Sequence, residues 1–111
     1  MDKQWIRVAG RTDVPDGGTL AVEACDEPLC LYNLAGRIYA THDMCTHEEA
    51  SLAEGYVDGD CIECPLHQAQ FHIPTGEVRA PPATRDLRIY PVKIDGDDIL
   101  VQLDSGAGEA S

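Results

Sequence analysis

Apolar residues recur at every second position over several short stretches of the chain. Leu20, Val22 and Ala24 show this two-residue period, which is typical of a half-buried β-strand. No segment keeps the 3.6-residue apolar spacing of an amphipathic helix, and no internal repeat is present. The pattern therefore predicts an all-β protein.

Gly-containing dipeptides divide the later apolar stretches into expected hairpins. The strongest signal is Asp95-Gly96, between residues 87–94 and 99–103, because Asp-Gly suits a two-residue hairpin loop. Pro91 interrupts the first of these stretches and has no N–H to donate, so we expect a sheet edge or a bulge there. Three further turns are expected: Ala35-Gly36 between 29–34 and 37–41, Asp58-Gly59 before 61–64, and Thr75-Gly76 between 71–73 and 77–78.

The middle of the chain has a different composition from its flanks. Residues 42–82, approximately, are polar and rich in Gly and Pro, and they hold all four histidines and three of the five cysteines. We expect a loop-rich subdomain there, set in a β scaffold formed by the flanks. Because 111 residues support one modest core, residues 1–111 are expected to form a single domain, with a flexible tail at 104–111.

Charge and hydropathy exclude some classes of function. A formal net charge of −12 argues against nucleic-acid binding, since phosphates would be repelled. No apolar stretch approaches the roughly 18 residues of a membrane helix, and the first residues lack the features of a signal peptide. We therefore expect a cytoplasmic protein, whose cysteines are better explained by metal binding or burial than by disulfides.

Two short motifs carry the candidate chemistry. Cys45-Thr46-His47 and Cys64-Pro65-Leu66-His67 each supply one thiolate and one imidazole, with sixteen residues between His47 and Cys64. Cys45, His47, Cys64 and His67 would suit one [2Fe–2S] cluster with two sulfur and two nitrogen ligands. Two cysteines and two histidines can also hold a single tetrahedral Zn²⁺, which is the alternative.

These motifs resemble those of the Rieske family, and more narrowly the Rieske ferredoxin components of bacterial aromatic-ring dioxygenases. The resemblance covers nearly the whole chain. It also includes the segments around Trp5, Phe71, Thr75-Gly76, Pro81-Pro82 and Tyr90-Pro91-Val92-Lys93.

The resemblance implies a fold, a cofactor and partners. The fold would be three antiparallel sheets with a cluster at one tip. Cys45 and Cys64 would hold the inner iron, His47 and His67 the outer iron, and a proline loop at 80–83 would cover the cluster. The chain would carry one electron from a flavin-containing, NAD(P)H-dependent ferredoxin reductase to a terminal oxygenase in aromatic compound degradation. It would not be an enzyme by itself, and it has no G-x-G-x-x-G dinucleotide motif.

Departures from high-potential relatives bear on the reduction potential. Ala50 and Leu66 stand where respiratory Rieske proteins would have an extra pair of cysteines, and Ala69 and Phe71 stand where those proteins have hydroxyl side chains. Missing hydroxyl donors and a strongly acidic chain disfavour reduction, so we expect a potential towards the low end of the Rieske range. Glu48-Glu49 could lower it further or form an ordinary acidic turn.

Other features are expected to be structural. Cys61-Ile62-Glu63-Cys64 spells C-x-x-C, but a thioredoxin-like motif should open a helix, so Cys61 is expected to be a strand residue. We expect a turn between Cys25 and Cys30 without a disulfide. His42 and His72 are expected to be surface or structural histidines. The second hypothesis for the whole chain is a Rieske-fold subunit of another monooxygenase or reductase.

Overall fold

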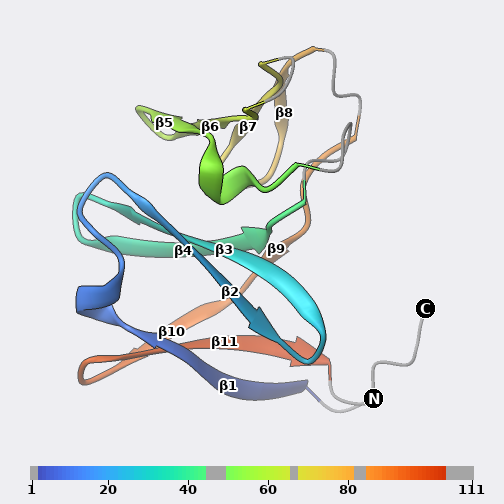
Figure 1. Cartoon of the computed structure of the whole chain (residues 1–111). Helices are drawn as coiled ribbons and strands as arrows, with labels where there is room; N and C mark the ends of the chain where they lie inside the picture. Colours follow the sequence, from blue (N-terminus) through green and yellow to red (C-terminus); the bar gives the residue numbers. More distant parts are fainter. Residues whose placement is uncertain (1–2, 45–49, 66–67, 82–84, 105–111) are drawn as a thin grey trace.

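The computed structural model describes residues 3–44, 50–65, 68–81 and 85–104. Within these ranges the protein is built from β-strands and two short 3-10 helices, and no α-helix is present. None of the described residues forms a helix long and apolar enough to span a membrane. The strands pair into three antiparallel sheets (Figure 1). This confirms the all-β fold that the apolar pattern predicts and the three sheets that the resemblance implies.

A three-stranded sheet of order β1-β11-β10 forms the base of the molecule as drawn in Figure 1. Its strands are β1 (Lys3–Gly10), β10 (Val92–Asp95) and β11 (Asp98–Asp104). The expected Asp95-Gly96 hairpin is confirmed: Asp95 pairs with Asp98, and Gly96 has a φ of 64°, a value that favours glycine.

A four-stranded sheet of order β2-β3-β4-β9 forms the middle layer. Its strands are β2 (Thr19–Ala24), β3 (Glu27–Leu34), β4 (Arg37–His42) and β9 (Ile89–Tyr90). Ala35 and Gly36 form the expected turn between β3 and β4, with φ values of 56° and 91°. The preceding turn is made by Cys25 and Asp26, so Cys25 lies within it, while Cys30 is buried in β3.

The expected interruption at Pro91 is confirmed, and it is a sheet edge at which the chain changes sheets. Ile89 and Tyr90 pair with β4, whereas Val92–Asp95 pair with β11. Pro91 therefore lies where the chain leaves the edge of the middle sheet and enters the edge of the basal sheet. Its missing N–H needs no partner there, and its carbonyl accepts a hydrogen bond from the Gln102 N–H at 3.1 Å.

The third sheet, of order β5-β6-β7-β8, consists of strands of three residues each. They are β5 (Tyr56–Asp58), β6 (Cys61–Glu63), β7 (Gln70–His72) and β8 (Val78–Ala80). All of them fall inside the predicted subdomain, whose boundaries at 42 and 82 remain a prediction. Of the predicted tail, only Asp104 is among the described residues.

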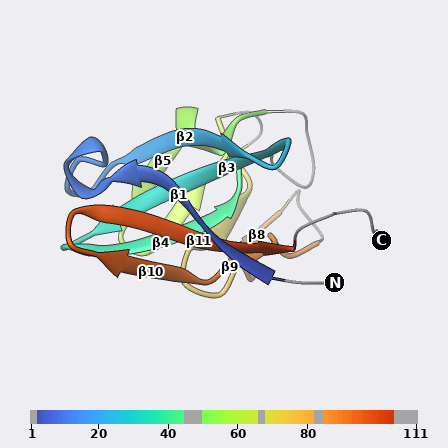
Figure 2. The same ribbon diagram turned by 90° about the horizontal axis from the view of Figure 1, so that it is seen from below.

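Two apolar clusters join the three layers. The first lies between the basal and middle sheets, which cross one another in Figure 2. The second joins the middle sheet to the third sheet, with Tyr32 on one side and Cys64 and Phe71 on the other. The members of the second cluster are Cys30, Tyr32, Ala50, Leu52, Ile62, Cys64, Ala69, Phe71, Ile73 and Leu87.

Two titratable groups in the second cluster should make stability fall at alkaline pH. Burial raises the pKa of the Cys30 thiol to about 12 and the pKa of Tyr32 well above its ordinary value of 10.0. Both groups ionise more readily in the unfolded chain, so their contribution is complete below the unfolded pKa values and is lost as pH rises above them. Each should lower the free energy of unfolding by about 1.4 kcal/mol per pH unit in that range.

Urea unfolding between pH 8 and pH 11.5, approximately, measures this slope. Cys30→Ala removes one titrating group, so its stability should fall less steeply than that of the wild type above about pH 9. Equal slopes for the two proteins would contradict the assignment.

Candidate metal centre

Of the four predicted ligands, the described part of the chain contains Cys64 alone. Cys45, His47 and His67 lie outside the described residues, as do Glu48 and Glu49. Cys64 follows the last residue of β6 and is 1% exposed. Consistently, no group of three His, Cys, Asp or Glu that could hold a metal ion occurs among the described residues. The four-ligand set therefore remains a prediction.

The second ligand motif begins at a closed turn. The Cys64 N–H donates to the Ala69 carbonyl at 2.7 Å, across the ends of β6 and β7. Ile62 pairs with Phe71 in the same hairpin, and both side chains are fully buried. The hairpin therefore fixes residue 64 at the edge of the apolar cluster, as an inner thiolate ligand would require.

The first ligand motif also begins and ends at paired residues. Met44 forms an isolated antiparallel bridge with Ser51, and the Leu52 N–H donates to the Asp43 carbonyl at 2.7 Å. Residues 45–49, which contain Cys45 and His47, lie between these contacts. These contacts lie between the end of β4 and the short helix η2 (Leu52–Glu54). Residues 43–44 and 51–52, which they join, are called the neck of the first ligand loop below.

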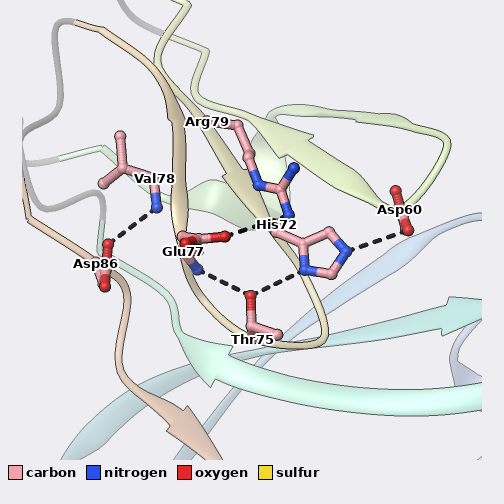
Figure 3. Close-up of polar contacts among 7 residues, drawn as sticks. All are labelled: Asp60, His72, Thr75, Glu77, Val78, Arg79 and Asp86. Atoms are coloured by element: carbon pink, nitrogen blue, oxygen red, sulfur yellow. Dashed lines mark hydrogen bonds and ion pairs between the residues drawn. The ribbon is translucent and has the colours of Figure 1, made fainter.

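The predicted proline loop has an anchor on its C-terminal side. The Val78 N–H in β8 donates to the Asp86 carboxylate at 3.0 Å (Figure 3). Pro81 is the last described residue before the gap at 82–84. The described ends of all three loops lie on the same side of the molecule in Figure 1.

His72 is structural, as expected. One ring nitrogen contacts the Thr75 hydroxyl at 2.9 Å, and the other contacts the Asp60 carboxylate at 3.2 Å (Figure 3). The Gly76 N–H donates to the His72 carbonyl at 2.6 Å, which places the expected Thr75-Gly76 turn beside it. Because both ring nitrogens are engaged, neither is available to a metal ion.

Cys61 is a strand residue, as expected from its β context. It opens β6 and pairs with Asp58 and His72 on its two sides. Desolvation raises its pKa above the ordinary value, which disfavours the thiolate. A thioredoxin-like role needs a low-pKa cysteine at the start of a helix, so the C-x-x-C spacing has no such meaning here.

Sequence reasoning missed two anchoring carboxylates. Asp43 is buried at the neck of the first loop, and Asp86 holds the base of the proline loop. Asp43 lies two positions before Cys45, the first residue of the first ligand motif. This short separation is the one sequence feature that could have indicated a role for Asp43 at the site.

The three-sheet fold and the buried Cys64 in the β6–β7 hairpin are compatible with the predicted iron–sulfur site, and the comparison with known families identifies the class of protein. The chain belongs to the Rieske [2Fe-2S] domain family, whose model matches residues 4–91. One Rieske-type cluster is the cofactor of this family.

Two curated relatives are similar over most of the chain. The naphthalene 1,2-dioxygenase system ferredoxin component of Pseudomonas aeruginosa is 39% identical, over 93% of this chain and 99% of the relative. The biphenyl dioxygenase ferredoxin subunit of Pseudomonas sp. (strain KKS102) is 43% identical, over 86% of this chain and 88% of the relative.

A solved structure is similar in fold and sequence. It is described as a complex of reduced oxygenase and oxidized ferredoxin in carbazole 1,9a-dioxygenase. The match has a TM-score of 0.82 and 37% identity, and it covers 87% of this chain and 91% of the matched chain.

Proposed function

We propose that this protein is a one-electron carrier of an aromatic-ring dioxygenase system. It accepts electrons from a flavin-containing, NAD(P)H-dependent ferredoxin reductase and passes them to the Rieske centre of a terminal oxygenase. The observation that supports the proposal most strongly is that the chain aligns with 99% of the length of a relative named as a ferredoxin component, at 39% identity. The protein is therefore a carrier and not an enzyme by itself.

The proposed ligands are Cys45 and Cys64 for the inner iron and His47 and His67 for the outer iron. When bound, a Rieske cluster supplies a one-electron redox couple. The chain's own residues set part of its surroundings: the hairpin of β6 and β7 buries Cys64 against the second apolar cluster. The donor set of two thiolates and two imidazoles suits this cluster.

Charge supports a role in docking with basic partners. The net charge of −12 would speed encounter with a reductase or oxygenase that carries basic patches, and would orient the complex. The same charge opposes nucleic-acid binding. We place the protein in the cytoplasm, where thiols stay reduced. Cys25, Cys30 and Cys61 form no disulfide among the residues that the structure describes.

Stopped-flow reconstitution tests the function. NADH and a naphthalene-dioxygenase-type reductase should reduce the protein, and addition of the matching oxidised oxygenase should reoxidise it. Without the reductase, NADH should leave the protein oxidised, and without the oxygenase no arene should be consumed. Arene turnover by the purified protein alone would contradict the carrier role and favour the enzyme-subunit hypothesis.

Colour separates the cluster from the zinc alternative. A [2Fe–2S] protein absorbs visible light, whereas a protein with one Zn²⁺ at the same four ligands is colourless. A colourless protein with one zinc per chain would overturn the proposed cofactor.

A further inference from the structure

Asp43 is the one buried charged side chain in the described part of the chain. It is 5% exposed and directly follows β4, two positions before Cys45. Taking a carboxylate out of water is costly unless its oxygens are well hydrogen-bonded. A charge kept at this place therefore calls for a structural or functional reason.

Both carboxylate oxygens of Asp43 accept hydrogen bonds from the far side of the first ligand loop. The Ser51 hydroxyl donates to Oδ2 at 2.6 Å, and the Ala53 N–H donates to Oδ1 at 2.9 Å. Ser51 is also the residue that bridges to Met44. The side chain thus spans the two ends of the loop that contains Cys45 and His47.

The backbone of Asp43 fixes the same neck to the scaffold. Its N–H donates to the Pro28 carbonyl in β3 at 2.9 Å, and its carbonyl accepts from the Leu52 N–H at 2.7 Å. Four hydrogen bonds therefore join this one residue to β3 and to residues 51–53. None of these hydrogen bonds belongs to the ladder between two named strands. They therefore fix the ends of the first ligand loop and do not contribute to strand pairing.

We propose that Asp43 is a positioning residue, which joins the two described ends of the first ligand loop and places a buried negative charge near the cluster. This inference rests on the proposed cofactor site. Two residues of chain span at most about 7 Å, so the Asp43 Cα lies within that distance of the Cys45 Cα. A negative charge this close, in a medium of low dielectric constant, opposes the arrival of an electron.

The two roles can be separated by substitution. Asp43→Asn removes the charge but keeps an acceptor for the Ala53 N–H and a polar group for Ser51. Asp43→Ala removes the charge and both side-chain bonds. Ser51→Ala removes one bond and keeps the charge. Asp13→Asn is the matched control, because Asp13 accepts from the Gly10 N–H at 2.9 Å at a turn of the basal layer.

The measurements are the midpoint potential and the rate of iron loss to a chelator, both on cluster-loaded protein. Asp43→Asn should have a more positive potential than the wild type and Asp13→Asn, with iron loss within about threefold of the wild type. Ser51→Ala should lose iron about threefold faster or more, and Asp43→Ala about tenfold faster or more, as loss of one and two hydrogen bonds predicts.

Either of two results would overturn the inference. One is a potential for Asp43→Asn equal to that of Asp13→Asn, and the other is a wild-type rate of iron loss from Ser51→Ala. If Asp43→Ala does not fold, these two variants still decide the question. A wild-type protein without a two-iron cluster would instead refute the proposed function, so the two failures are distinguishable.

Discussion

Cys64→Ser is expected to abolish cluster binding, with iron and sulfide falling from two of each per chain to near zero. Serine oxygen is a harder and less donating ligand than thiolate and does not suit this iron site. Cys64 is 1% exposed and its N–H donates to the Ala69 carbonyl at 2.7 Å, so the serine is held in the same buried hairpin. Iron and acid-labile sulfide analysis of purified protein measures the loss.

The same substitution should destabilise the third sheet more than the basal sheet. A ligand present at a thousandfold excess over its Kd contributes about 4 kcal/mol to stability, and a bound cluster contributes folding energy in the same way. Hydrogen exchange should therefore quicken in β5–β8 while β1, β10 and β11 keep their protection.

Cys61→Ser is the matched control, because Cys61 lies in the same hairpin and is not a proposed ligand. It should keep wild-type iron and sulfide. A parallel pair is His67→Ala, which should lose the Rieske-type EPR signal, and His72→Ala, which should keep it. Native iron and sulfide content in Cys64→Ser would show that the ligand assignment is wrong.

The midpoint potential is expected below zero at neutral pH, towards the low end of the range of roughly −150 to +300 mV for Rieske centres. Ala69 and Phe71 are fully buried behind the Cys64 turn and neither has a hydroxyl group. The resemblance to high-potential Rieske proteins implies that hydroxyl donors at these two positions stabilise the added electron, and this chain has none there.

Adding a donor should raise the potential. Ala69→Ser introduces a hydroxyl beside the Cys64 turn, and a hydrogen bond to a charged acceptor contributes about 1.5–3 kcal/mol. The shift in midpoint potential is set by how much stronger this hydrogen bond is in the reduced state than in the oxidised state. For one electron, each 1.4 kcal/mol of that difference corresponds to about 59 mV. We expect an increase of roughly 40–100 mV by redox titration, with a further increase in the double variant with Phe71→Tyr.

Ala40→Ser is the control for this prediction. Ala40 is 2% exposed in the other apolar cluster, so its serine variant adds a buried hydroxyl remote from the third sheet. It should lower stability and leave the potential unchanged. A wild-type midpoint well above zero, or equal potentials for Ala69→Ser and Ala40→Ser, would contradict the argument.

Local patterns were sufficient to predict most of the hairpins. Ala35-Gly36 and Asp95-Gly96 adopt positive φ values at their glycines, which is the physical reason these dipeptides signal turns. The first strand was not predicted from periodicity, although Ile6 and Val8 both pack against the basal core. Its pairing with β11 joins the two ends of the chain, and local sequence carries little information about such distant partners.

The change of sheets at Pro91 shows a second limit of sequence reasoning. The proline correctly indicated a sheet edge. Because a residue without an N–H fits at the edge of either the middle or the basal sheet, the proline did not predict that the chain passes from one to the other. Asp43 shows a third limit. From sequence alone, an aspartate before a ligand motif cannot be told from a solvated turn residue, because its hydrogen bonds to Ser51 and Ala53 depend on the folded structure. The ligand motifs themselves were readable because metal chemistry restricts residue type and spacing strongly.

Electron–nuclear double resonance of the dithionite-reduced protein, labelled with ¹⁵N-histidine, tests the ligand set most directly. If paired sulfur donors hold one iron and His47 and His67 hold its neighbour, the spectrum should show couplings to two histidine nitrogens, one from each residue. Couplings to fewer histidine nitrogens, or a reduced sample without any iron–sulfur signal, would contradict the account.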